Sequence, residues 1–328
     1  MLRHICRSVV LILMFGSTIL AADGNGGYAG SFFQIPVGAR PTAMGGAYLA
    51  VSDDGAGPLF NPAGLTDLKR PLLGSSYRVL ALDRSLGYVT VMFPARGESA
   101  IGVNWLYAGS GDVTVRDQNG TDLGRTLSFN NHAFSALFAK RFEDYLSAGL
   151  KASYLHATFA EMTAFSVSLD LGVMLYIDQF FSRESRDLLP VQDMRLGLVV
   201  KHVAAEYHWN NHNYIAEFRD PTALSTDQDD AVPLEVGLGG SARFFQRKLL
   251  VAMDVRKNEK QDPSFCAGAE YLIVPEFALR GGFSDGRFTV GTGYVLEIGK
   301  HTLAIDYAFS TDKVDEGSEH IFSFDFLF

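Results

Sequence analysis

Residues 38–65, GARPTAMGGAYLAVSDDGAGPLFNPAGL, contain polar groups whose chemistry calls for a partner. Arg40, Asp53 and Asp54 stand there among small residues, and an Asn61-Pro62 step follows. A guanidinium and two carboxylates can form ion pairs and hydrogen bonds with polar groups elsewhere in the chain. Pro62 has a fixed φ and disfavours helix at Asn61, which predicts a rigid turn that directs the Asn61 amide. This is the chemistry of an anchor.

A second group of polar residues, YHWNNHNY, contains His208 and His212. A metal site would need a third ligand such as Glu206 or Glu217, so we interpret this stretch as an aromatic loop that contacts lipid headgroups or a partner. The acidic run DQDD at 227–230 lacks the spaced oxygen ligands and the Gly of a calcium loop. No metal and no cofactor is expected.

A nucleophile for catalysis is not indicated. The sequence has no Gly-x-Ser-x-Gly turn, and Ser110 in AGSGD has no assigned base. A triad is recognised by geometry, so spacing alone leaves a hidden Ser/His pair open. We predict that the protein is not an enzyme, with an outer-membrane hydrolase as the least favoured alternative.

The first 22 residues predict a secretory signal peptide, with Arg3 and Arg7 before an apolar run at 9–20. The run is shorter than the roughly 20 residues of a membrane-spanning helix, which favours cleavage near Ala22 over an anchor. With 28 basic and 37 acidic residues the net charge is −9, and loss of the two arginines would leave −11. A nucleic-acid partner is therefore not expected, because it requires a clustered positive surface.

From residue 72 onward the hydrophobic pattern has a period of two, which indicates strands. In residues 163–177, for example, Phe165, Val167 and Leu169 alternate with Ser166 and Ser168. Most of the expected strands have the length of about 9–11 residues that a tilted strand needs to cross a bilayer. Fourteen strands are predicted, at 72–79, 85–93, 99–107, 128–140, 146–156, 163–176, 194–203, 232–245, 248–256, 264–273, 276–284, 287–297, 302–310 and 320–328.

The connections between these strands differ in length. Short polar turns are expected at 94–98, 142–145, 245–247 and 284–286. Long loops are expected at 108–127, 177–193, 204–231 and 311–319. Alternation of short turns with long loops is typical of outer-membrane barrels, in which turns face the periplasm and loops face the exterior.

The fold predicted from this pattern is an all-β transmembrane antiparallel barrel of about 14 strands. A soluble β-sandwich would also alternate, but fourteen strands would usually form two domains, and no linker between domains is visible. The last strand places Phe322, Phe324, Phe326 and Phe328 on one face, and it resembles the C-terminal signal read by the outer-membrane insertion machinery.

The segment 38–65 resembles the N-terminal signature of the PorV/PorQ family, a group of FadL-like outer-membrane barrels. The matching blocks are Gly38-Ala39-Arg40, Ala43-Met44-Gly45-Gly46-Ala47, Val51-Ser52-Asp53-Asp54 and Asn61-Pro62-Ala63-Gly64-Leu65. The resemblance implies a fourteen-stranded barrel whose N-terminal segment folds into the lumen as a plug. We therefore expect a signal peptide at 1–22, a plug segment at 23–71 and a barrel at 72–328.

The plug is expected to contact charged residues on the inward face of the strands. We predict that Arg40, Asp53, Asp54, Asn61 and Pro62 anchor it and control opening of the pore. The candidate lumen partners are Lys151, Asp170, Arg195, Lys201 and Glu235. Irregular backbone is tolerated at membrane depth inside protein or a wet cavity, and a lumen provides both. The alternative is a Gly-rich capping loop outside the barrel.

The resemblance implies a protein of the bacterial outer membrane, surrounded by its lipid. The PorV branch is associated with type IX secretion, which implies binding or delivery of secreted cargo or contact with secretion-complex proteins. The alternative is a FadL-like transporter of hydrophobic small molecules, in which a hydrophobic ligand would occupy the lumen.

Overall fold

The computed structural model describes residues 28–117, 119–160, 162–182, 190–210, 228–311 and 318–328. The expected signal peptide, with the proposed cleavage site, lies outside these ranges. Among the described residues, no helix is long and apolar enough to span a membrane.

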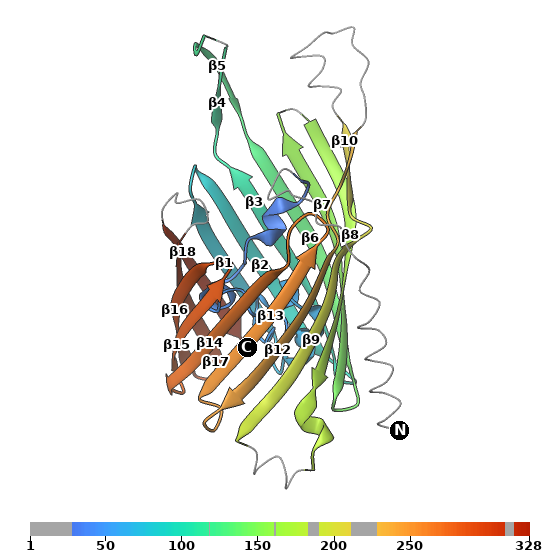
Figure 1. The fold of residues 1–328 in the computed structure, drawn as a ribbon, viewed down its shortest axis with the longest axis vertical. Helices are drawn as coiled ribbons and strands as arrows, with labels where there is room; N and C mark the ends of the chain where they lie inside the picture. Colours follow the sequence, from blue (N-terminus) through green and yellow to red (C-terminus); the bar gives the residue numbers. More distant parts are fainter. Residues whose placement is uncertain (1–27, 118, 161, 183–189, 211–227, 312–317) are drawn as a thin grey trace.

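Fourteen antiparallel strands form a closed barrel (Figure 1), because β8 pairs with β9 and β1 pairs with β18. The strands are β1 (Leu72–Leu80), β2 (Arg84–Ala95), β3 (Ser99–Ser110), β6 (Phe129–Phe142), β7 (Leu146–Phe159), β8 (Met162–Tyr176), β9 (Val191–Val203), β12 (Glu235–Phe244), β13 (Leu249–Asn258), β14 (Ser264–Val274), β15 (Phe277–Ser284), β16 (Arg287–Ile298), β17 (His301–Thr311) and β18 (Ser318–Leu327). Each predicted strand overlaps one of these, which confirms the barrel and excludes the sandwich.

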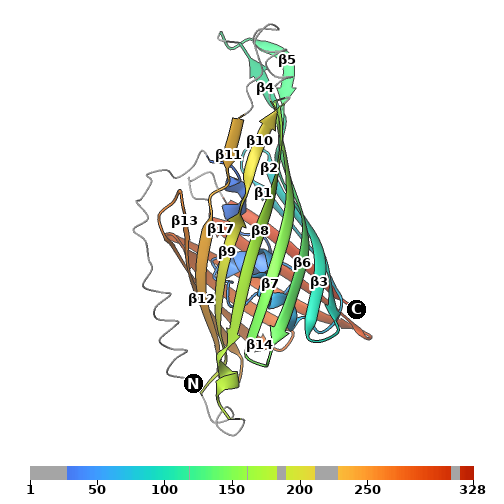
Figure 2. The same ribbon diagram turned by 90° about the vertical axis from the view of Figure 1, so that its right-hand side faces the viewer.

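Four further strands extend beyond the barrel at one end, which we call the loop end. β4 (Val113–Arg116) and β5 (Asp122–Leu127) form a separate hairpin there. β10 (Glu206–Asn210) pairs with β8 and with β11 (Gln228–Ala231), so it prolongs the barrel wall. Figure 2 shows the hairpin and the β10–β11 pair projecting past the other strands. Part of the expected loops 108–127 and 204–231 is therefore sheet.

Two connections lie at the opposite end from the one that their length suggested. The strands β8 and β9 are connected at the turn end, where η4 (Ile177–Phe180) lies together with the short turns 96–98 and 143–145. The short turn 285–286 joins β15 to β16 at the loop end. Antiparallel strands reverse direction at every connection, so strand order decides the end and loop length does not.

The outward faces of the strands are apolar and exposed, whereas the inward faces are buried and often polar. On β8, Phe165 and Val167 are 55% and 59% exposed, while Ser166 and Asp170 are buried. The aromatic side chains of Phe322 and Phe324 on β18 also face outward. This arrangement is that of a barrel with an apolar outer band around a polar interior.

Residues 28–71 enter the interior of this barrel, where Figure 1 shows them in blue. Their short helices are η1 (Ser31–Gln34), α2 (Ala39–Ala43), η2 (Gly57–Leu59) and η3 (Pro62–Asp67). We call residues 38–65 the plug core and residues 28–37 the plug entry segment. The plug core supplies some of the most completely buried side chains of the molecule, including Met44, Tyr48 and Leu49.

Candidate functional site

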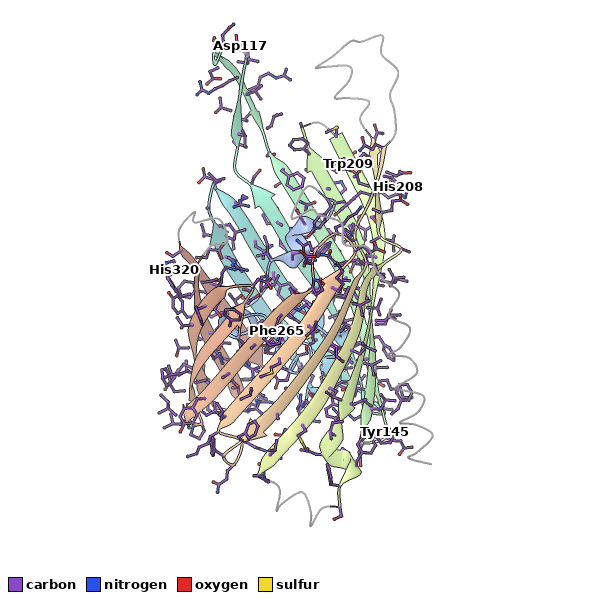
Figure 3. The ribbon with its side chains drawn as sticks, viewed as in Figure 1. Asp117, Tyr145, His208, Trp209, Phe265 and His320 are labelled. Atoms are coloured by element: carbon purple, nitrogen blue, oxygen red, sulfur yellow. The ribbon has the colours of Figure 1, made fainter. Side chains whose placement is uncertain are left out.

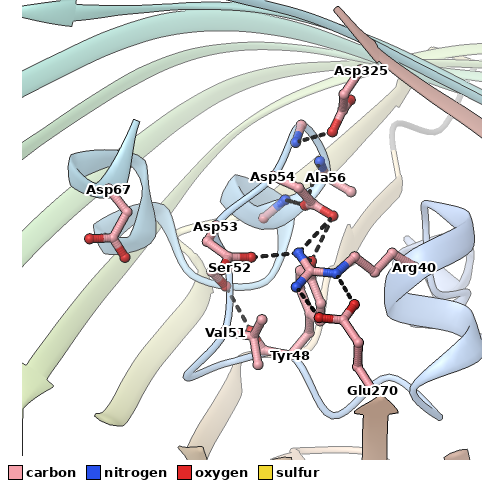
Figure 4. A network of polar contacts seen from close by, with 12 residues as sticks. Arg40, Tyr48, Val51, Ser52, Asp53, Asp54, Ala56, Asp67, Glu270 and Asp325 are labelled. Atoms are coloured by element: carbon pink, nitrogen blue, oxygen red, sulfur yellow. Dashed lines mark hydrogen bonds and ion pairs between the residues drawn. The ribbon is translucent and has the colours of Figure 1, made fainter. Parts of the chain in front are cut away.

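Arg40 is the centre of the polar network that holds the plug core (Figure 4). Its Nε donates to Oε2 of Glu270 on β14 at 2.7 Å, and its Nη2 donates to Oε1 at 3.0 Å. Its Nη1 donates to the Tyr48 hydroxyl at 2.8 Å and to Oδ1 of Asp53 at 2.6 Å. The paired contacts with Glu270 have the bidentate geometry that makes arginine–carboxylate interactions strong and directional. Arg40 therefore links the plug core both to itself and to the wall.

The adjacent carboxylates Asp53 and Asp54 have different environments. Burial disfavours ionisation of Asp53, but Arg40 and the wall cations Arg195 and Arg243 outweigh it and lower its pKa. Burial raises the pKa of Asp54, and the negative charge of Asp53 adds to the effect. Oδ1 of Asp54 accepts the backbone N–H of Gly57 at 2.9 Å and thereby closes a local turn.

Two further wall carboxylates bind backbone N–H groups of the plug core. Oδ2 of Asp254 on β13 accepts from the amides of Tyr48 at 2.7 Å and Leu49 at 2.9 Å. Oδ2 of Asp325 on β18 accepts from the amide of Gly55 at 2.9 Å, as Figure 4 shows. These bonds satisfy irregular backbone that would otherwise be costly to bury.

Asn61 and Pro62 form the turn that the sequence predicts. Asn61 is fully buried, and its amide Nδ2 donates to the carbonyls of Leu49 at 2.9 Å and Val173 at 3.1 Å. Its Oδ1 accepts from the amide of Ala63 at 3.0 Å and so begins η3. The side chain connects two parts of the plug to strand β8.

Glycines of the wall allow the plug backbone to approach closely. A Cβ added at Gly172 would lie 2.1 Å from Oδ1 of Asn61, and one at Gly197 would lie 2.2 Å from the Leu49 carbonyl oxygen. A Cβ at Gly282 would lie 2.1 Å from the amide nitrogen of Gly45. Such distances exclude any side chain, so these inward positions require glycine.

The five predicted lumen residues are buried or nearly so, but they contact one another more than the plug core. Lys151 pairs with Asp170 at 2.5 Å, and Lys201 pairs with Glu235 at 3.0 Å. Arg195 does reach the plug, where its Nη1 contacts Oδ2 of Asp67 at 2.8 Å and the Val51 carbonyl at 3.3 Å. Glu235 also accepts from Nε2 of Gln34 at 3.1 Å. Whether these groups control opening stays a prediction.

Sequence reasoning missed Glu270, Asp254 and Asp325, the wall carboxylates with the most direct contacts to the plug core. Each occupies a polar position in an alternating strand, as in VAMDV, AGAEYL and FSFDF. The same alternation that identified Asp170 would have found them. The wall glycines carried a second signal, because glycine inside a strand often marks close approach of another backbone.

An open cavity lies above the plug at the loop end, with a volume of about 420 Å³. Two deeper spaces beside the plug measure only about 30 and 10 Å³. Below the cavity, the described residues of the plug core are buried against the wall along most of their length. The lining of the upper cavity includes Phe32, Ile35, Leu80, Phe129, Arg78 and Glu319.

The other sequence candidates lie near the loop end. His208 and Trp209 on β10 are labelled in Figure 3, and Nδ1 of His208 lies 2.7 Å from Oδ1 of Asp229. His212 and Glu217 are outside the described residues, and among those described no group of three metal-ligating side chains occurs. Ser110 accepts a hydrogen bond from the amide of Phe129 at 3.1 Å.

No protein-family model matches the chain, and no curated protein matches its sequence. Solved structures do share its fold. The Ralstonia pickettii toluene transporter TbuX has a TM-score of 0.60 at 15% identity, over 89% of this chain and 98% of TbuX. The Pseudomonas putida toluene transporter TodX has a TM-score of 0.60 at 12% identity, over 89% of this chain and 98% of TodX.

A FadL homologue from Pseudomonas aeruginosa has a TM-score of 0.58 at 10% identity, over 89% of this chain and 98% of that protein. The chain therefore has the fold of FadL-like barrels. TbuX and TodX are described as transporters, and the absence of enzymatic activity in this chain stays a prediction. None of the three is described as a PorV/PorQ protein, so that resemblance and the cargo role remain predictions.

Proposed function

We propose that this protein is an outer-membrane channel that admits hydrophobic small molecules, and that its plug moves to let them pass. The observation that carries the proposal is an open cavity of about 420 Å³ directly above a plugged lumen. Two of the neighbours with this fold are described as toluene transporters. The proposal thus agrees with the alternative drawn from the sequence.

The upper cavity suits an apolar ligand with a small polar group. Phe32, Ile35, Leu80 and Phe129 supply apolar surface, and the ion pair between Arg78 and Glu319 supplies polar groups at one side. Ligand sites of about 300–1,000 Å³ commonly combine an apolar lining with a few polar groups. A molecule bound here would contact the plug entry segment before it met any other part of the plug.

Passage beyond this cavity requires the plug to move, because the deeper spaces of about 30 and 10 Å³ are too small for an aromatic hydrocarbon. The plug is held by packing of apolar side chains such as Met44 and Leu49, and also by hydrogen bonds and ion pairs, which can exchange with water or with other polar partners. We infer a channel that is closed at rest and opens by local rearrangement of the plug.

A reversible lock on the plug tests this function. In the double variant Leu49→Cys and Gly239→Cys, with Cys266→Ser to prevent mispairing, the new thiols would face one another. The Leu49 Cβ lies 2.8 Å from a Cβ placed at Gly239, and that Cβ would also lie 2.3 Å from Oδ1 of Asp254. The Asp254 carboxylate must therefore turn aside, and the two Cβ atoms must separate to the roughly 3.8 Å of a disulfide. Heat-modifiable migration of the reduced double variant verifies that it has folded. Uptake of radiolabelled toluene by cells should fall on oxidation and recover with reductant. The Cys266→Ser single variant is the control. If oxidation of the double variant did not reduce toluene uptake, the proposal would be contradicted.

The resemblance of residues 38–65 to PorV/PorQ proteins supports a second candidate, a barrel that binds secreted cargo. The projecting β4–β5 hairpin could contact such a partner, since its Val113 and Leu123 are 61% and 51% exposed. Replacing residues 113–127 with a short Gly-Ser turn separates the candidates. Loss of partner binding with normal toluene uptake would assign the hairpin to cargo.

A further inference from the structure

An apolar groove of about 870 Å³ lies on the outer face of the barrel, across β2, β3, β6, β7 and β8. The side chains that form its walls face away from the lumen: Trp105, Phe134 and Tyr154 are 39%, 51% and 48% exposed. Outward-facing Ala136 and Ala152 also line it. The groove is therefore separate from the plug and from the upper cavity, and it faces the surrounding lipid.

Strand register explains why the surface is hollow here. Ala136 on β6 is paired with Ala152 on β7, so two small side chains lie next to each other on the outer face. Larger pairs flank them along the same strands, with Phe134 opposite Tyr154 on one side and Phe138 opposite Leu150 on the other. A pair of methyl groups between pairs of large side chains leaves a notch the width of two strands.

Two histidines lie at the rim of this groove toward the loop end. His132 and His156 are direct cross-strand partners, one outward position beyond Phe134 and Tyr154, and their ring centroids are 6.4 Å apart. The indole Nε1 of Trp105 donates to Nδ1 of His132 at 3.2 Å. The neutral His132 ring then carries its proton on Nε2, which is a donor for an anion.

The height of the histidines suits a membrane interface. His132 is ten residues along β6 from Phe142, which lies at the turn end near Tyr145. Ten residues of a strand tilted by about 40° rise about 25 Å, which is the height of the apolar band of such barrels. Trp105 and Tyr107 contact His132 at this level, where Trp and Tyr commonly meet lipid headgroups.

We propose that the groove binds one acyl chain of an outer-leaflet lipid whose anionic phosphate headgroup contacts His132 and His156. An amphiphile of this kind matches both parts of the site, the apolar notch at hydrocarbon depth and the paired imidazoles above it. A purely apolar occupant would leave the donor on Nε2 of His132 without an acceptor. The lipid would stabilise this wall from outside without entering the lumen.

Fluorescence quenching of Trp105 tests the proposal, since the chain has only two tryptophans and Trp209→Phe leaves Trp105 as the reporter. The full-length variant is reconstituted in phosphatidylcholine vesicles that contain brominated phosphatidylglycerol or, separately, brominated phosphatidylcholine at the same mole fraction. Brominated chains quench a neighbouring indole. We expect the anionic lipid to bind about tenfold more tightly, the factor that corresponds to one hydrogen bond at the weak end of the charge-assisted range.

Two sets of variants distinguish binding of the lipid headgroup from binding of the lipid acyl chain. His132→Phe with His156→Phe should remove the preference for the anionic lipid, whereas the matched His320→Phe, at an outward histidine on β18, should keep it. Ala136→Phe should reduce quenching by both lipids, whereas Ala267→Phe on the outer face of β14 should not. Heat-modifiable migration on a gel verifies that each variant has folded.

Equal quenching by the two lipids in the parent protein would overturn the proposal, and so would a preference that survives both histidine substitutions. Dimers that disappear with Ala136→Phe would instead assign the groove to a second copy of the chain and overturn the lipid site. None of these measurements uses uptake of a hydrophobic molecule. The lipid site can therefore be disproved while the proposed channel function is retained.

Discussion

The plug core and the plug entry segment meet the same barrel in different ways. The core, residues 38–65, is buried along most of its length and is bound by Arg40, Asn61, wall carboxylates and wall glycines. The entry segment, residues 28–37, is mostly half-buried, and several of its residues line the open upper cavity. Regions with fewer buried contacts open at lower free-energy cost. A ligand would therefore displace the entry segment first, and the core would respond later.

Deleting residues 38–65, the plug core, should give the largest change of all the variants that compare the two parts of the plug. The wall carries its own backbone pairing, so we expect a folded barrel with a water-filled lumen and greatly increased conductance in planar bilayers. Deletion of residues 28–37 alone, as the control, should change conductance much less. A core deletion that conducts no better than the intact protein would mean that residues 38–65 do not close the pore.

Replacing Arg40 by Leu should destabilise the core strongly. The change leaves Glu270 with only Arg280 and Asp53 with only Arg243 as an ion-pair partner, so we expect a loss of about 3 kcal/mol, the lower end of the roughly 3–5 kcal/mol for a broken buried pair. The free energy of unfolding in detergent, measured by denaturant titration, reports the loss. The additional change Glu270→Gln should recover part of it, and a purely additive double variant would show that the two residues are not coupled.

A pair of neighbouring glycines on β15 tests the close approach of plug and wall. Gly282→Ala places a Cβ 2.1 Å from the amide nitrogen of Gly45, so we expect a loss of about 1–3 kcal/mol in stability. Gly281 faces the other way, with its nearest atom 4.0 Å away, and Gly281→Ala should be nearly neutral. Equal effects in denaturant titrations of the two variants would argue against tight packing of the core.

Asn61→Ala should cost about 1–3 kcal/mol, because it leaves the carbonyls of Leu49 and Val173 and the amide of Ala63 without their side-chain partner. The barrel should still fold, but single-channel recordings should show more frequent spontaneous opening. Unchanged opening with reduced stability would make Asn61 a purely structural anchor.

Ile35→Ala in the entry segment should have the smallest effect on stability, below about 1 kcal/mol, because the side chain is half-buried beside a cavity. It removes apolar surface from the proposed ligand site, so the concentration of toluene that gives half-maximal uptake should rise. A stability loss as large as that of Asn61→Ala would remove the distinction between the two parts of the plug.

Much of the wall could be predicted because strand alternation is a local property. Phe165, Val167 and Ser166 reveal their two faces through their neighbours in sequence, and the strand boundaries follow where the alternation stops. The end of the barrel at which a connection lies depends on strand order. The end at which β8 connects to β9 could therefore be assigned only once all strands had been placed in order. Loop length was a poor guide, since 285–286 is short and yet lies at the loop end.

By itself, the sequence determined the fourteen strands, their apolar outer face and the polar character of residues 38–65, because these depend on residue type and short-range spacing. Only the tertiary structure decided which charges meet. Lys151 pairs with Asp170 across two adjacent strands, while Arg40 reaches Glu270, 230 positions away. Such partners are selected by strand register, barrel closure and the path of the plug. A hydrophobic period carries no information about these long-range distances.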